Sequence, residues 1–275
     1  MKPIVFALVI SVAGSSVLMA GPEPIRDDKK TVVAPEQPRP LCNWTGFYMG
    51  ANVGYAFEGN ADVTLDLGGQ WNNFPHPRDA DVVGPLGSRD LNASGVVAGG
   101  FLGYNYQWHR FVFGAEADVD YVGLRDSFNS GIVTVNPRPL FPSLGGVRHS
   151  YETNYLATVG PRVGYAVDRF LLYATGGLAI GDLKFSQRIV EPQSVFSEEG
   201  SSDGTQVGWT VGGGVQYCIA EHWSARVEYR YTDLGCTDFN TAATEGGTPS
   251  TEIFTGHHEA CLTYHSVTAG LAYKF

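Results

Sequence analysis

The sequence predicts an all-β protein, an eight-stranded antiparallel up-and-down transmembrane β-barrel, and three observations predict it. Eight segments alternate large apolar residues with small or polar ones, which is the period of a strand with two unlike faces. The connections between these segments are alternately long and short. The 35 glycines, 14 tyrosines and 15 phenylalanines, with only 17% charged residues, suit many strands better than helices.

The first 43 residues precede the predicted barrel and divide into two segments. Residues 1–20 predict a signal peptide, with Lys2 at its start and an apolar stretch from Ile4 to Met19. A single N-terminal membrane anchor is the alternative. Residues 21–43 are rich in proline and charge, which predicts a disordered periplasmic tail. No later segment reaches eighteen consecutive apolar residues, so a bundle of membrane helices is excluded.

Two of the eight predicted strands have an uncertain detail. The strands are expected at residues 44–57, 92–107, 111–124, 151–167, 170–186, 206–220, 223–234 and 263–275. Pro161 falls in the apolar register of its strand, which predicts a bulge there. The segment 170–186 is apolar or glycine on both faces, so its register stays open.

The connections indicate which side of a membrane each end of the barrel faces. Those at 58–91, 125–150, 187–205 and 235–262 are long, whereas those at 108–110, 168–169 and 221–222 are tight. Long loops on one side and tight turns on the other are typical of an outer-membrane barrel, with long external loops and short periplasmic turns. We therefore expect the residues 44–275 to form a barrel in the outer membrane of a Gram-negative bacterium, after signal-peptide export.

The apolar face is expected to meet lipid, and not to fill the interior as in a soluble barrel. The interior of an eight-stranded barrel is only just wide enough for side chains, and Phe, Trp and Tyr from most strands would overfill it. The opposite face is rich in glycine. Aromatic residues near the strand ends are candidates for the two interfacial girdles: Trp44, Tyr106, Trp108, Tyr121, Tyr165, Phe170, Tyr217, Trp223, Tyr231 and Phe275.

The opposite face places charged residues in the narrow lumen. They are Glu116, Asp118, Asp120, Arg162, Arg226, Glu228 and Arg230. Buried charges need partners, so these acids and arginines predict an internal salt-bridge network. The favoured interpretation is a structural plug that holds the barrel shut. The alternative is a gated ion path, which would make the protein a narrow, low-conductance pore.

Five segments carry a resemblance to a known family: WTGFYMGANVGY, GGFLGYNYQ, LLYATGGLAIG, WSARVEYRYTDLG and HSVTAGLAYKF. In this order they resemble the small porin-like outer-membrane antigens of alpha-proteobacteria, which include hemin-binding members and have an OmpA-type barrel. The resemblance spans residues 44–275. It implies an abundant surface protein that supports envelope integrity, without catalytic residues. It also implies that the terminal Phe275 is a signal read by the outer-membrane barrel assembly machinery.

Four cysteines depart from what that resemblance leads us to expect. In an oxidising compartment they should pair, and three connectivities exist. Cys236 and Cys261 both lie on the long-loop side, where a bond would clamp the base of the fourth external loop. Cys42 and Cys218 would then pair by elimination, although their strands are not neighbours and the tail would have to fold under the barrel mouth. The absence of any disulfide is the open alternative.

The remaining candidate site is a histidine pair in the fourth long connection. His257 and His258 could ligate hemin iron or a transition metal, although adjacent loop histidines are more often solvated. The sequence contains no nucleophile elbow, P-loop or HExxH motif, so we predict no enzyme and no cofactor. The net charge of −10 argues against nucleic acid as a partner.

We therefore expect a structural, porin-like outer-membrane protein that contributes to envelope integrity and surface exposure. Its expected partners are outer-membrane lipid, lipopolysaccharide and the barrel assembly machinery. One alternative is a surface receptor or adhesin that binds hemin or a host ligand through its long loops. The second alternative is the narrow pore.

Overall fold

The computed structural model describes residues 42–69, 88–136, 143–191, 196–245, 248–249 and 254–275. The expected signal peptide and the tail up to residue 41 lie outside the described residues. Cys42 and Asn43, which the sequence assigned to the tail, are described together with the barrel. No helix within the described ranges is long and apolar enough to cross a membrane.

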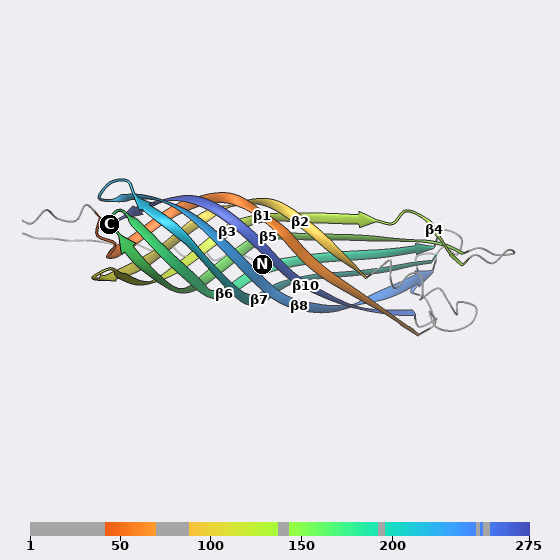
Figure 1. Ribbon diagram of the computed structural model, residues 1–275. Coiled ribbons are helices and arrows are strands. Elements are labelled where there is room, and N and C mark those ends of the chain that lie inside the picture. The colour runs from red at the N-terminus through yellow and green to blue at the C-terminus, as the bar shows by residue number, and fades with distance from the viewer. Residues whose placement is uncertain (1–41, 70–87, 137–142, 192–195, 246–247, 250–253) are drawn as a thin grey trace, which may run out of the picture. The chain divides into compact units, whose positions relative to one another are not determined.

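The described chain contains ten β-strands, of which eight close into a ring. They are β1 (Gly46–Gly69), β2 (Arg89–Trp108), β3 (Phe111–Asn129), β4 (Val133–Asn136), β5 (Ser143–Val167), β6 (Phe170–Glu191), β7 (Phe196–Cys218), β8 (Trp223–Glu245), β9 (Thr248–Pro249) and β10 (Phe254–Lys274). Each long strand is antiparallel to its neighbours, and β10 pairs with both β8 and β1 (Figure 1). The short strands β4 and β9 pair only with β5 and β8. The predicted eight-stranded antiparallel barrel is confirmed.

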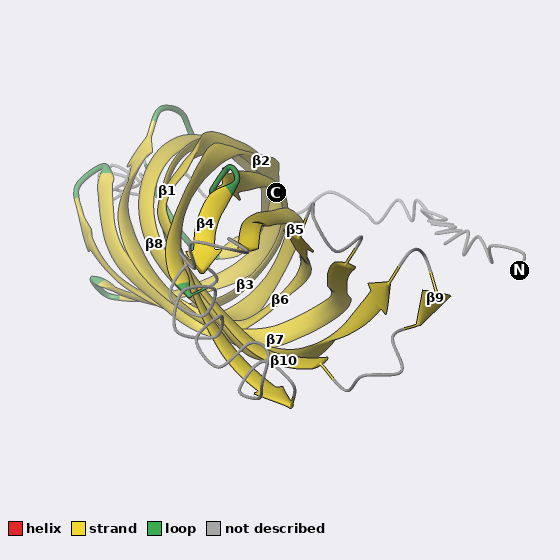
Figure 2. Cartoon of the chain, turned by 90° about the vertical axis from the view of Figure 1, so that its right-hand side faces the viewer, coloured by secondary structure: helices red, strands yellow, loops and turns green. Residues whose placement is uncertain are grey.

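The strands extend further than the sequence indicated, mainly on the side of the long connections. The barrel strands contain 19 to 25 residues, whereas about 9–11 residues suffice to cross a bilayer. Strand β8, for example, continues to Glu245 through a stretch that was expected to be loop. Beyond the membrane the alternation is inverted: on β6, for example, Leu183, Phe185 and Ile189 are buried inside, whereas the polar residues at the alternate positions are exposed. The apolar residues of these extensions therefore no longer continue the lipid-facing register. Figure 2 looks along the barrel from this extended end.

The apolar face points outward, as predicted. Phe47, Leu102 and Val119 are each more than 60% exposed, and most of the expected girdle aromatics lie on the same outer face. Trp44 is the exception, because it is only 6% exposed and lies inside the barrel mouth. It precedes the first residue of β1, so the alternation of that strand does not govern its side chain.

The structure decides the two details that the sequence left uncertain. On β6, Leu171 and Tyr173 point inward. No bulge is present at Pro161, which pairs in register with Ala115. The register between β5 and β6 shifts instead between Glu152 and Leu156. There the Asp182 carboxylate accepts hydrogen bonds from the backbone N–H groups of Asn154 and Tyr155, which lie within the shift.

The interior is packed in successive layers along the strands. An apolar cluster near the tight turns contains Cys42, Trp44, Val112, Ala166, Leu171, Tyr173 and Cys218. A larger apolar cluster occupies the other side of the charged residues and includes Val97, Val122, Leu124, Tyr151, Leu156, Leu183, Phe185, Leu234, Leu262 and Tyr264. The charged side chains of β3, β5 and β8 therefore lie between two apolar layers.

Candidate functional site

The lumen charges come from strands on opposite sides of the ring. Strands β3 and β8 are separated by four steps in either direction around the barrel. Alternate residues of each strand point inward, so the acids of β3 face the arginines of β8 across the lumen. Arg162 joins them from β5, the neighbour of β3. The fold thus brings together charges that lie about one hundred residues apart in the sequence, as the separation of 110 residues between Glu116 and Arg226 illustrates.

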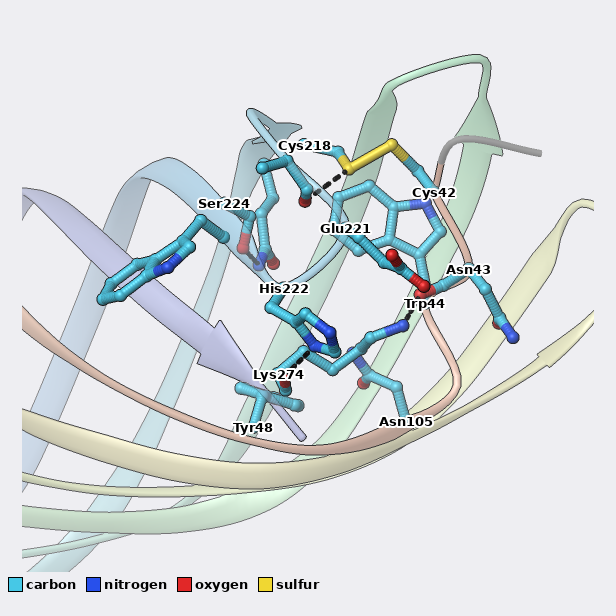
Figure 3. Close-up of a pocket in the computed structure, with 13 residues that line it drawn as sticks. Cys42, Asn43, Trp44, Tyr48, Asn105, Cys218, Glu221, His222, Ser224 and Lys274 are labelled. Carbon is cyan, nitrogen blue, oxygen red and sulfur yellow. Dashed lines mark hydrogen bonds between the residues drawn. A yellow bond between two sulfur atoms is a disulfide. The ribbon is translucent and has the colours of Figure 1, made fainter. Parts of the chain in front are cut away.

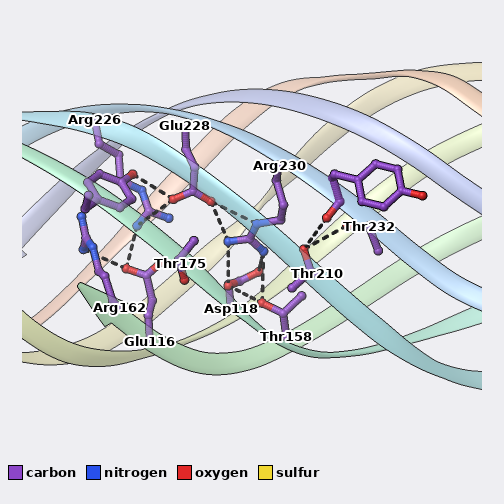
Figure 4. A network of polar contacts seen from close by, with 12 residues as sticks. Glu116, Asp118, Thr158, Arg162, Thr175, Thr210, Arg226, Glu228, Arg230 and Thr232 are labelled. Atoms are coloured by element: carbon purple, nitrogen blue, oxygen red, sulfur yellow. Dashed lines mark hydrogen bonds and ion pairs between the residues drawn. The ribbon is translucent and has the colours of Figure 1, made fainter. Parts of the chain in front are cut away.

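Glu116 is the centre of the first group of contacts. Its Oε2 accepts hydrogen bonds from Arg162 Nη1 at 3.1 Å and from Arg226 Nη1 at 2.7 Å (Figure 4). The Tyr48 hydroxyl donates to the same oxygen at 2.7 Å. Arg162 also donates to Gln216 Oε1 at 2.6 Å. One carboxylate thus neutralises part of two guanidinium groups that are only 1% exposed.

Arg230 is the centre of the second group. Its guanidinium donates to Asp118 Oδ1 at 2.6 Å and to Glu228 Oε1 at 2.7 Å. The Thr158 hydroxyl donates to Asp118, and the Tyr173 hydroxyl donates to Glu228 at 2.8 Å. Charge-assisted hydrogen bonds of this kind fix side chains more firmly than neutral ones. The two groups are adjacent, because Glu228 Oε2 lies 3.9 Å from Arg226 Nη1.

Aromatic rings close the space around the arginines. The guanidinium carbon of Arg162 lies 3.6 Å from the centre of the Tyr173 ring, and that of Arg226 lies 3.4 Å from the centre of the Phe101 ring. Such cation–π contacts stabilise a charge where water is excluded. A Cβ atom at Gly103 would collide with the Tyr48 hydroxyl, so this glycine makes room for the network.

Six of the seven predicted lumen charges form the ion pairs of this network. The seventh, Asp120, takes part in none of them. Glu116, Asp118 and Glu228 balance the three arginines. Asp120 is 4% exposed, and within the described ranges it forms no ion pair.

The sequence reasoning missed the neutral members of the network. Tyr48 could have been found from the sequence, because it is a large polar residue on a strand face that otherwise carries small residues and glycine. Tyr173 gave no signal, since both faces of its segment are apolar.

The segment before β1 closes the end of the barrel near the tight turns. Cys42 is bonded to Cys218, the last residue of β7, and both are buried (Figure 3). Lys274 Nζ donates to the backbone oxygen of Asn43, and the backbone N–H of Trp44 donates to Gln107. The cavity that remains beside Trp44 measures about 20 Å³, which is room for about one water molecule. We name residues 42–45 the strap.

Comparison with known proteins identifies the family. The model of the outer membrane protein beta-barrel domain matches residues 42–275. The chain belongs to this family. Over the full length of both chains it is 30% identical to the 31 kDa outer-membrane immunogenic protein of Brucella melitensis. It is 32% identical to the 22 kDa outer membrane protein of Rhizobium leguminosarum, over 74% of this chain and 70% of that relative.

Among solved structures, the barrel is similar to the outer membrane protein OprG of Pseudomonas aeruginosa, with a TM-score of 0.40 and 11% identity over 86% of this chain and 98% of that one. The relatives confirm the predicted resemblance to outer-membrane antigens of alpha-proteobacteria. The protein is located in the outer membrane of a Gram-negative bacterium. The tight turns and the strap therefore lie at the periplasmic end of this outer membrane protein beta-barrel.

The second disulfide of the barrel joins Cys236 and Cys261, which are direct partners in the ladder between β8 and β10. The expectation that it clamps the base of a loop needs correction, because the ladder continues past it to the pair Ala242 and Thr255. These two sulfurs and Glu259 are the one group of metal-ligand atoms found close together among the described residues. Both sulfurs are engaged in the disulfide, so the group offers no metal site in this state.

The structure separates the two histidines that the sequence paired. His257 is exposed on the outer face of β10 and contacts Asn240 Oδ1 at 3.1 Å, whereas His258 is buried on the inner face. Successive residues of a strand point to opposite faces, so the two cannot share one ligand. His258 lies instead near His149, whose ring stacks on Phe128 and contacts Phe185 at a tilt. Burial first, and then the nearby His149 and His257, lower the pKa of His258 to about 4.

Proposed function

We propose that this outer-membrane barrel is a structural, porin-like envelope protein with a closed lumen, exposed at the cell surface and without catalytic activity. The observation that supports it is the packing of the interior. The strap fills the periplasmic end, the ion-pair network spans the middle, and a buried apolar cluster fills the section beyond. The immunogenic outer-membrane relatives support the surface exposure.

The two apolar layers make an ion path through the lumen unfavourable. Leu124, Leu234 and Leu262 have no exposed surface, so water does not reach these side chains of the outer layer. An ion without paired charge or water in such a layer meets a large desolvation cost. The network charges are also satisfied by one another, and a permeating ion would have to compete with them.

Planar-bilayer recordings of the refolded protein test the closed lumen. We expect no discrete conductance steps from the wild-type protein. We also expect none from Arg226→Ala, because the apolar layers on both sides stay in place. Val227→Ala, on the outer face of the same strand, is the matched control. Steps from the wild-type protein that Arg226→Ala enlarges would show that the barrel is a narrow pore.

Heat-modifiable migration on a gel tests the barrel itself. A closed, hydrogen-bonded barrel should migrate faster before boiling than after it. Identical migration of boiled and unboiled samples from the outer-membrane fraction would contradict the proposed compact barrel.

The alternative function, a surface receptor for hemin, is not supported by the histidine pair that was its candidate ligand set. Hemin ligation by His257 and His258 together is incompatible with their position on opposite faces of β10. A hemin titration of the refolded protein, with and without His257→Ala and His258→Ala, checks this conclusion. We expect no change in the Soret absorbance of hemin that depends on either histidine.

A further inference from the structure

The outer face of β3, β5, β6 and β7 carries three rows of directly paired polar side chains beyond the membrane. The row nearest the membrane consists of Arg125, Glu152, Lys184 and Asp203; the middle row consists of Ser127, Ser150, Ser186 and Ser201; the outermost row consists of Asn129, Arg148, Arg188 and Glu199. All twelve side chains are at least partly exposed. Neither the barrel wall nor the lumen network requires four serines in line.

The middle row forms the floor of a groove, because serine is short and the residues on both sides are long. Two cavities lie along it, of about 650 and 380 Å³, and both are lined by Ser150, Ser186 and Ser201. The hydroxyls of Ser150 and Ser186 are 2.7 Å apart, so the middle of the row presents a hydrogen-bonded pair of hydroxyl groups. We name this feature the serine groove.

The serine groove lies at the level of the outer-leaflet headgroups. Tyr121, Tyr155 and Trp209 are outward aromatic residues on β3, β5 and β7, and they lie near the external edge of the apolar band. The first charged row follows within a few residues on each of these strands. The groove also opens on the outside of the barrel, so its natural occupant approaches along the membrane surface and not through the lumen.

The charge pattern favours an anionic occupant beside the outermost row. Arg125 and Glu152 pair at 2.7 Å, and Lys184 lies directly opposite Asp203, so the row nearest the membrane is self-neutralised. In the outermost row Arg148 lies directly opposite Arg188. Like charges in that position destabilise a sheet. Arg188 forms an ion pair with Glu199, with 2.8 Å between Nε and Oε1. No carboxylate of the described ranges forms an ion pair with Arg148.

We propose that the serine groove binds the acidic sugar headgroup of the outer-leaflet glycolipid, lipopolysaccharide. The phosphate or carboxylate groups of that headgroup would pair with Arg148 and Arg188, because guanidinium groups bind both anions in a bidentate manner. The serine hydroxyls would donate to and accept from the sugar hydroxyls. The site rests on the proposed surface location of the barrel, but it is independent of the closed lumen.

A binding measurement on the full refolded chain in detergent tests the site, with deep-rough lipopolysaccharide as the probe. We expect the charge reversal Arg148→Glu/Arg188→Glu to weaken binding by about tenfold or more, the effect of losing one or two charge-assisted contacts. Ser186→Trp, which fills the groove without a change of charge, should weaken binding as well. The matched control is Arg110→Glu/Arg169→Glu, the same charge change at the periplasmic turns, and it should bind like the wild-type protein.

Further probes distinguish the source of the anion. Dephosphorylated lipopolysaccharide and inorganic phosphate separate the phosphate from the sugar contribution, and heparin represents a soluble acidic polysaccharide. Equal binding of lipopolysaccharide by the wild type and both groove variants would overturn the proposal. A loss of affinity in the Arg110→Glu/Arg169→Glu control as large as that in the groove variants would overturn it as well. Tight binding of heparin without binding of lipopolysaccharide would overturn the membrane glycolipid as occupant. Heat-modifiable migration of each variant shows whether it still folds, and a failure of the closed lumen would appear only in the conductance recordings.

Discussion

Glu116 shows how a single buried side chain can hold several strands together. It accepts hydrogen bonds from Tyr48 on β1, Arg162 on β5 and Arg226 on β8. Removal of one member of a buried ion pair leaves its partners charged and unpaired, which costs more than the pair itself contributes. The stability effect of such a position should therefore exceed that of any exposed pair.

The change Glu116→Gln should lower the free energy of unfolding by about 3–5 kcal/mol, because two buried guanidinium groups lose their common countercharge. Urea unfolding in lipid vesicles, followed by tryptophan fluorescence, measures it. Glu152→Gln removes the partner of Arg125 on the exposed outer face and should cost less than about 1 kcal/mol. Similar losses for the two variants would contradict the structural role of the network.

His258 should make the extended end of the barrel sensitive to acid. Its folded-state pKa of about 4 lies below the ordinary value of 6.5, so folding favours the neutral imidazole. The associated stability is complete above pH 6.5 and is lost progressively as the pH falls towards 4.

We therefore expect a lower urea midpoint at pH 5 than at pH 7.5, and a smaller difference in His258→Phe. His257→Phe, on the exposed face of the same strand, should keep the full difference. An unchanged pH dependence in His258→Phe would assign the acid sensitivity to other groups.

At the level of elements, the strands were predictable where lipid selects their outward residues. Between the two girdles every outward position must be apolar or aromatic, so the alternation is strong. Outside the membrane this selection ends, and the pairs Arg125–Glu152 and Ser150–Ser186 look like loop sequence although they lie in regular strands. For this reason the sequence placed the start of β5 and the end of β6 too close to the membrane.

Phe275 directly follows β10, the strand that closes the ring. Its backbone N–H donates to the Phe47 oxygen at 3.0 Å, and its ring lies against Tyr273 while remaining 68% exposed. Deletion of Phe275 removes few contacts, so the unfolding free energy should change little. We expect a clear loss of protein from the outer-membrane fraction in cells, if this residue is read during assembly.

An immunoblot of that fraction, beside urea unfolding of the refolded protein, separates assembly from stability. Phe47→Ala is the control, because Phe47 is an equally exposed aromatic residue on the adjacent strand. Normal outer-membrane levels of the deletion variant would contradict the assembly role of Phe275.

For the molecule as a whole, the ring of eight strands and its lipid-facing side followed from the sequence because both are repeated in every strand. The ion-pair partners of the lumen charges did not follow from the sequence, because they depend on which strands face each other and on the register of each strand pair. Asp118 and Arg230 illustrate this, because they lie 112 residues apart on opposite sides of the barrel. The serine groove needs the register of four strands at once, and three of its serines lie in stretches that had been assigned to loops.

The strap has a mechanical consequence. The bond between Cys42 and Cys218 joins positions 176 residues apart, so the chain from the strap to the end of β7 is a covalent circle. A pulling force on the chain ahead of Cys42 reaches the start of β1 and the end of β7 at the same time. The load is divided between two points on the periplasmic rim, and β1 cannot be unzipped alone from that end. A tether attached to this segment could therefore carry load without peeling β1 away from its neighbours.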